Sequence, residues 1–109
     1  MGVISRSLLA GAILAVLWPG PPARAIEAEQ FFGLCSNKDD EANYNFCLGY
    51  TFAIAEALYN VPERTVCFEG IQPHTLLEAV ISYMADLPDR SGAAGPTVAA
   101  ALEASFPCK

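Results

Sequence analysis

Four cysteines, Cys35, Cys47, Cys67 and Cys108, are the residues of this sequence with the clearest chemical meaning. Successive members are 12, 20 and 41 positions apart, so the C-x-x-C spacing of many zinc and thiol-exchange sites does not occur. An even number of cysteines in a short chain is typical of structural disulfides when the chain is exported, as the signal-peptide pattern described below predicts here. We therefore predict two disulfides and no metal site.

The other side chains offer little for catalysis. The single histidine, His74, falls on the exposed flank of a predicted helix. Asp39, Asp40 and Glu41 are consecutive, which suits helix capping and solubility better than acid–base chemistry. The sequence contains no metalloprotease, P-loop, nucleophile-elbow or dinucleotide-binding glycine motif. We therefore predict a protein that is not an enzyme, has no catalytic residues and needs no cofactor.

The first 25 residues have the layout of a secretory signal peptide. Arg6 precedes an apolar stretch over residues 8–18, and the segment ends in the small-x-small pattern Ala23-Arg24-Ala25. Eleven apolar residues are fewer than the roughly 20 that cross a bilayer. We predict cleavage after Ala25, which leaves residues 26–109 as one soluble exported domain.

The charge of this domain limits the partners that suit it. Residues 26–109 contain four basic and twelve acidic side chains and carry a formal charge of −8. Nucleic acids and anionic lipids select basic surfaces, so neither is expected as a partner. An acidic domain suits a basic protein partner, although the charge also serves solubility.

Apolar periodicity and helix-stop residues predict four helices and no strand. The helices are expected at about 26–34, 41–59, 73–87 and 96–106. Proline opens the third near its first turn, where the missing N–H does no harm. The expected fold is an all-α, small four-helix bundle stapled by two disulfides.

The helix at 41–59 is apolar over most of its circumference, so we expect the other helices to surround it. Asp39 or Asp40 is its expected N-cap. Gly49, Ala53 and Ala57 recur every four residues, which predicts a shallow groove where a neighbouring helix approaches closely.

Helix order favours one of the three possible disulfide pairings. If consecutive helices are antiparallel, Cys35 and Cys47 lie at one end of the bundle and Cys67 and Cys108 at the other. We therefore predict the pairs Cys35–Cys47 and Cys67–Cys108. The main alternative joins Cys47 to Cys67 across the second helix.

Three motifs in the second helix, before the third helix and at the chain end resemble those of a known family. They are Phe46-Cys47-Leu48-Gly49-Tyr50, Val66-Cys67-Phe68-Glu69-Gly70-Ile71 and Phe106-Pro107-Cys108. Together they resemble the Rap/Tai family, the periplasmic immunity proteins of type VI secretion systems that neutralise peptidoglycan amidase effectors. The resemblance covers nearly all of residues 26–109.

The resemblance implies a periplasmic, disulfide-bonded helical protein, often dimeric, that binds a cell-wall amidase and occludes its catalytic cleft. In some members the loop before the last helix enters that cleft. Here the corresponding residues are Asp89, Arg90 and Ser91, followed by Gly92. Asp89 is the candidate for electrostatic contact with a catalytic Cys–His pair.

Two other functions also fit these observations. One is a periplasmic acid-stress chaperone, similar to small helical disulfide-bonded chaperones, because acid would neutralise most of the twelve carboxylates and loosen the bundle. The other is an exported helical domain without a dedicated partner.

Overall fold

The computed structural model describes residues 25–109. The predicted signal peptide, apart from its last residue, lies outside the described residues. None of the helices within residues 25–109 combines the length and the apolar character needed to cross a membrane.

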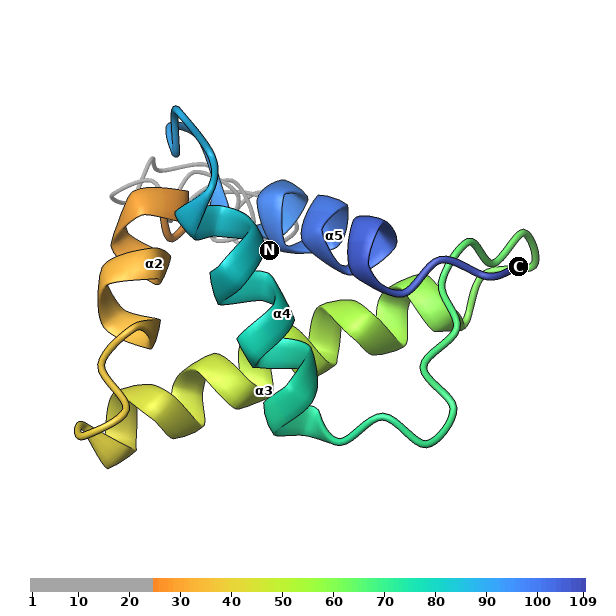
Figure 1. Ribbon diagram of the computed structural model, residues 1–109, viewed down its shortest axis with the longest axis horizontal. Helices are drawn as coiled ribbons and strands as arrows, with labels where there is room; N and C mark the ends of the chain where they lie inside the picture. Colours follow the sequence, from red (N-terminus) through yellow and green to blue (C-terminus); the bar gives the residue numbers. More distant parts are fainter. Residues whose placement is uncertain (1–24) are drawn as a thin grey trace, which may run out of the picture.

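Four helices follow one another along the described chain, and no strand longer than an isolated bridge joins them there. They are α2 (Ala28–Cys35), α3 (Glu41–Tyr59), α4 (Pro73–Ala85) and α5 (Ala94–Ser105). In Figure 1, α3 runs across the view below α5, and α2 and α4 stand steeply against it. The predicted all-α fold is confirmed.

Three different features fix where α3, α4 and α5 begin. The carboxylate of Asp40 accepts a hydrogen bond from the backbone N–H of Asn43 at 3.0 Å, which makes Asp40 the N-cap of α3. Pro73 opens α4 as predicted. The last helix begins two residues before the predicted Pro96, because Ala94 is fixed by donating its N–H to the carbonyl oxygen of Ile26 at 2.8 Å. Proline is tolerated there, since first-turn N–H groups have no partner within a helix.

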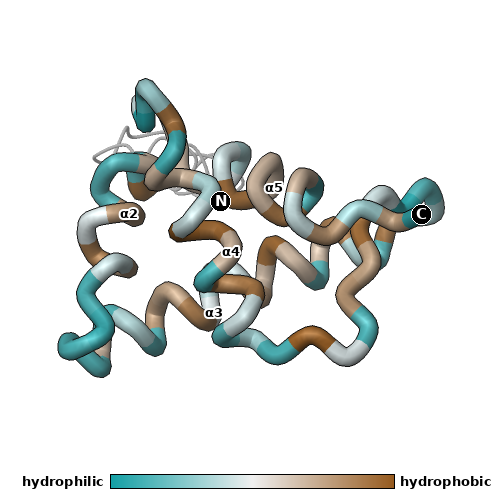
Figure 2. Tube along the Cα trace, viewed as in Figure 1, coloured by the Kyte–Doolittle hydropathy of each residue, from teal (hydrophilic) through white to brown (hydrophobic). Residues whose placement is uncertain are grey.

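The core lies where α2, α4 and α5 meet the inner side of α3. Its largest fully buried side chains include Phe31 from α2, Leu77 and Met84 from α4, and Leu102 from α5. Figure 2 shows hydrophobic stretches of α3, α4 and α5 near the middle of the molecule and a hydrophilic turn between α2 and α3. Burial of these side chains is what holds such short helices in place.

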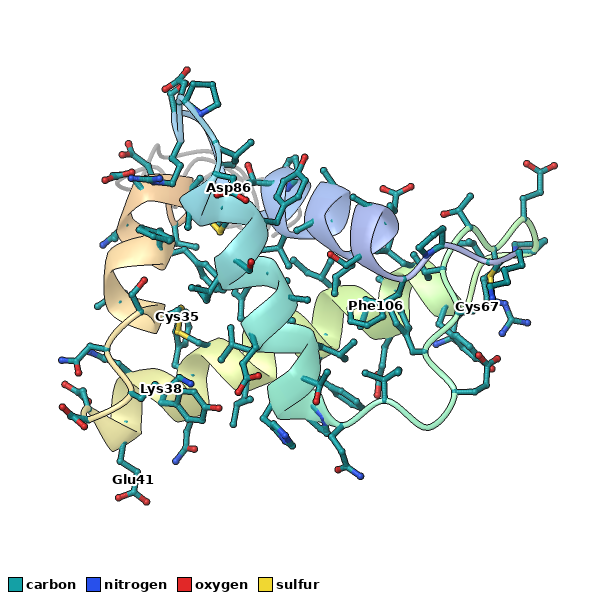
Figure 3. The ribbon with its side chains drawn as sticks, in the orientation of Figure 1. Cys35, Lys38, Glu41, Cys67, Asp86 and Phe106 are labelled. Atoms are coloured by element: carbon teal, nitrogen blue, oxygen red, sulfur yellow. A yellow bond between two sulfur atoms is a disulfide. The ribbon has the colours of Figure 1, made fainter. Side chains whose placement is uncertain are left out.

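The two disulfides have the predicted pairing. The Cys35–Cys47 bond joins the end of α2 to the second turn of α3, and the Cys67–Cys108 bond joins the connector before α4 to the segment after α5. Figure 3 places Cys35 and Cys67 toward opposite ends of the molecule. The second bond is accompanied by a backbone hydrogen bond from Cys67 to Phe106 at 2.9 Å. Closing loops of 12 and 41 residues is worth about 3 and about 4 kcal/mol respectively.

The prediction that other helices surround 41–59 is wrong. Only Cys47, Thr51 and Ala55 of α3 are buried. The predicted close helix approach at Gly49, Ala53 and Ala57 is also wrong, because all three residues are exposed and a Cβ added at Gly49 would meet nothing within 4 Å. Three short helices cover only one side of α3, so its other side remains in contact with solvent.

Candidate partner-binding surfaces

The loop at residues 86–92 projects from the fold between α4 and α5 (Figure 1). Within it, the carboxylate of Asp89 accepts hydrogen bonds from the backbone N–H of Ser91 at 3.1 Å and from its hydroxyl at 2.7 Å. Both residues are exposed. The loop ends at Gly92, whose φ of 89° is accessible to glycine at little cost. Asp89 and Ser91 therefore form a closed polar turn at the surface.

Arg90, the third predicted contact residue, turns toward the protein instead. Its Nε lies 2.6 Å from a carboxylate oxygen of Glu29, and its Nη1 donates to the carbonyl oxygen of Met84 at 3.0 Å. The guanidinium also lies 4.2 Å from the centroid of the Phe32 ring. With only 22% of its side chain exposed, Arg90 anchors the loop to α2 and to the end of α4.

The base of the loop is held as well. The N–H of Ala28 donates to the carbonyl oxygen of Gly92 at 2.8 Å, and Glu27 and Ala93 form an isolated antiparallel bridge. A loop fixed at its base and near its tip loses little conformational entropy on binding. The loop is thus preorganised to present Asp89 and Ser91.

A second surface lies on the exposed side of α3. We call it the Gly49 face, and it consists of Phe46, Gly49, Ala53 and Ala57, all exposed and uncharged. Phe46 is 47% exposed, although its ring packs against that of Tyr50 with 5.8 Å between the ring centroids. A contiguous exposed apolar surface of this kind often marks a contact with another molecule.

A third surface is a groove between the second half of α3, the connector at 60–72 and the start of α4. We call it the α3–α4 groove; its volume is about 420 Å³. Its lining combines apolar side chains with two carboxylates and an amide, namely Phe52, Ala55, Glu56, Tyr59, Asn60, Phe68, Glu69, Ile71 and Leu76.

One edge of the α3–α4 groove already holds an arginine of the same chain. The guanidinium of Arg64 lies 4.0 Å from the centroid of the Tyr59 ring, and its Nη1 lies 3.5 Å from Oε1 of Glu69. The hydroxyl of Tyr59 donates to the same Oε1 at 3.2 Å. The groove edge therefore combines an aromatic face with a carboxylate, which suits a guanidinium.

The residues weighed for catalysis do not converge. His74 is exposed at the second position of α4, and Asp39 and Asp40 lie in the turn before α3. Within residues 25–109, no group of three or more His, Cys, Asp or Glu side chains is placed to hold a metal ion.

Comparison with known protein families identifies the family to which this chain belongs. Residues 27–108 match the model of the Rap1a immunity proteins. The chain belongs to this family. The match spans the four helices of residues 25–109 and both disulfides, and it confirms the resemblance predicted from the three cysteine-containing motifs. No curated protein and no solved structure matches the chain.

Sequence reasoning did not find the α3–α4 groove in this Rap1a family member. Its lining comes from three segments that only the fold brings together, and the Arg64–Glu69 ion pair joins two residues of an irregular connector. One sequence feature that could have indicated the groove edge is that Arg64 and Glu69 have opposite charges and lie five positions apart.

Proposed function

We propose that this Rap1a family member is a periplasmic immunity protein that binds a type VI secreted peptidoglycan amidase and occludes its catalytic cleft. The observation that carries the proposal is the family match over residues 27–108. The two disulfides support a periplasmic location, because such bonds persist in oxidising compartments. The signal-peptide pattern at residues 1–25 supports export.

In the proposed complex the loop at 86–92 enters the cleft of the amidase. Asp89 brings a negative charge to the exposed turn, while the contacts of Arg90 with Glu29 and Met84 keep that turn in one position. A carboxylate aimed at a Cys–His pair favours the charged imidazolium and blocks access of the substrate. The formal charge of −8 on residues 26–109 would also speed association with a basic amidase.

The cellular experiment removes the gene and places the mutant beside kin whose type VI secretion system is active. We expect the mutant to lose viability and a full-length copy to restore it. A copy lacking residues 2–25 should stay in the cytoplasm and fail to protect, which makes it the matched control. Equal survival of mutant and parent, or protection by the leaderless copy, would contradict the proposal.

The loop is tested by Asp89→Asn, which removes the charge but keeps a side-chain oxygen for Ser91. Asp39→Asn is the control, since it removes an exposed carboxylate from the turn before α3. With the amidase that the cellular experiment implicates, we expect Asp89→Asn to weaken inhibition of peptidoglycan cleavage about tenfold or more. Equal inhibition by both variants would exclude the loop as the inhibitory element.

A homodimer is also proposed, on the basis of the resemblance to the Rap/Tai family. The uncharged Gly49 face is the surface that supports it, because small residues let two helices approach closely. Sedimentation equilibrium should give twice the chain mass, and Phe46→Glu should shift the protein to the monomer. A monomer at every accessible concentration would contradict this part of the proposal.

A further inference from the structure

We infer that the α3–α4 groove is a second binding site, which takes an arginine side chain from a basic segment of the protein partner. The identity of the partner rests on the proposed function, whereas the preference of the groove for a guanidinium can be tested alone. Three features of the groove favour an arginine: its apolar floor, the carboxylates at its rim, and Arg64, which is already held at its edge.

The floor of the groove suits the aliphatic part of a long side chain. Phe68, Ile71 and Leu76 provide apolar walls, and Phe52 is still 45% exposed, so its ring is free to contact a guest. The three methylene groups of arginine gain by covering such a surface while the charged head stays near water.

The rim carries two carboxylates against the single guanidinium of Arg64, and it has unused acceptors. Glu56 makes no side-chain hydrogen bond or ion pair with any of residues 25–109. Glu69 is 63% exposed and uses Oε1 for both Arg64 and Tyr59, which leaves Oε2 without a partner in the described chain. Among residues 25–109 the groove lining contains no basic side chain, and Arg64 lies only at its edge. Charge complementarity therefore favours a cationic guest.

Arg64 shows that the groove edge can recognise this guest. Its guanidinium lies over the ring of Tyr59 and is paired with Glu69 at the same time. A planar guanidinium gains from both contacts, whereas the compact ammonium of lysine gains less from an aromatic face. A second guanidinium would use the same kinds of contact with Phe52, Glu56 and the free oxygen of Glu69.

A second copy of this chain is a poor occupant of the groove. Residues 26–109 carry a charge of −8, so a second copy offers little positive charge to an acidic groove. Three of the four basic residues, Lys38, Arg64 and Arg90, are already in ion pairs. A different, basic protein fits the groove better.

The groove is separate from the loop at 86–92. In Figure 1 the connector that forms one of its walls extends toward the end of the molecule where the chain finishes, whereas the loop projects near α2. A partner segment in the groove would therefore add contacts that the loop alone cannot provide.

The direct test titrates the ¹⁵N-labelled exported protein, purified with both disulfides, with N-acetyl-arginine methylamide. We expect saturable shifts of the backbone amides at 52–60 and 68–76, which weaken as NaCl is raised to about 0.5 M. The citrulline counterpart has the same shape without the charge and should not saturate. No saturation with arginine, shifts mainly elsewhere, or equal binding of citrulline would overturn the inference.

Substitutions at the rim provide the matched comparison. Glu56→Gln and Glu69→Gln should each weaken binding of the arginine probe about two- to fivefold. Glu41→Gln should leave it unchanged, because Glu41 begins the same helix at the end of the molecule opposite Cys67 (Figure 3). An equal loss with Glu41→Gln would show that only the overall charge matters and would overturn the groove as a site.

The same variants separate this inference from the proposed function. If the double variant Glu56→Gln/Glu69→Gln inhibits the amidase as well as the parent protein does, the groove is not a partner site, although the immunity function stands. If the arginine probe binds as expected and no amidase is inhibited, the proposed function fails while the groove's specificity stands.

Discussion

Replacing Arg90 with alanine removes three interactions that hold the loop at 86–92. The ion pair with Glu29 contributes about 0.5 kcal/mol, because the Glu29 side chain is 64% exposed. The partly buried hydrogen bond to the carbonyl oxygen of Met84 contributes about 1 kcal/mol. The cation–π contact of the guanidinium, which lies 4.2 Å from the centroid of the Phe32 ring, adds about 0.5 kcal/mol. We therefore expect the free energy of unfolding to fall by about 2 kcal/mol.

Urea denaturation followed by circular dichroism, with both disulfides intact, measures this change. For a domain of this size, a slope of about 1 kcal/mol per molar urea places the midpoint of Arg90→Ala about 2 M lower at an unchanged slope. The ion pair is screened at about 1 M NaCl, so the difference between variant and parent should shrink by about 0.5 kcal/mol there.

Arg64→Ala is the matched control for Arg90→Ala. Arg64 also lies over an aromatic ring and beside a carboxylate, but it is more exposed, at 37%, and no backbone carbonyl accepts from it within the described residues. Its loss should cost less than about 1 kcal/mol. If Arg90→Ala costs less than about 0.5 kcal/mol, or no more than Arg64→Ala, then Arg90 does not anchor the loop and the argument for a preorganised turn is refuted.

Thr51→Val should raise the free energy of unfolding by about 1 kcal/mol, because the Oγ1 of Thr51 is fully buried without a hydrogen-bond partner among residues 25–109. The control Thr51→Ser keeps the hydroxyl but loses a methyl group, so it should destabilise the protein. If Thr51→Val instead lowers the free energy of unfolding, the hydroxyl of Thr51 has a hydrogen-bond partner. Replacing both Cys67 and Cys108 with alanine should cost about 4 kcal/mol in urea denaturation, and a loss below about 1 kcal/mol would contradict the loop-closure argument. In dilute protein, Gly49→Ala should raise the free energy of unfolding by about 0.5–1 kcal/mol and thereby raise the melting temperature, because the added Cβ would meet nothing within 4 Å. A lower melting temperature would mean that the Gly49 face is covered in solution.

Both ends of α3 and the start of α4 were predictable because the signals that set them are local. The N-cap Asp40 lies directly before Glu41, and the segment Asn60-Val61-Pro62 follows Tyr59, so the predicted range 41–59 matches α3 at both ends. Pro73 likewise marks the start of α4. The disulfide pairing could be predicted from helix order, because the order places the two cysteines of each pair at the same end of the bundle.

The surroundings of α3 could not be predicted in the same way. Phe46 and Phe52 are apolar like Tyr44 and Leu48, yet they are 47% and 45% exposed. Apolar periodicity reports which side chains gain from burial, and it does not distinguish a core from a surface that another molecule covers. The positions of α2, α4 and α5 decide this, and those depend on the whole chain.

The candidate site shows the same division between local and distant causes. A polar loop at Asp89–Gly92 was evident from its residues, whereas the inward turn of Arg90 depends on Glu29, which lies 61 positions away. Sequence resemblance identified the loop as a contact candidate, but it carried no information about which of its three side chains is already bound within the fold.

The positions of the two disulfides connect the stability of the fold with its two proposed contact sites. Cys67 lies in the irregular connector that supplies Phe68, Glu69 and Ile71 to the α3–α4 groove. The ring of Phe68 also packs against that of Phe106, with 5.9 Å between the ring centroids. The Cys35–Cys47 bond instead fixes α2, the helix that carries the Glu29 and Phe32 partners of Arg90. A connector without regular structure would otherwise sample many conformations, so closing it covalently should keep the groove in its binding shape. The variant lacking Cys67 and Cys108 should therefore lose binding of the arginine probe at temperatures where circular dichroism still shows a folded helical protein. It should keep the contacts of Arg90, because the bond that fixes α2 remains.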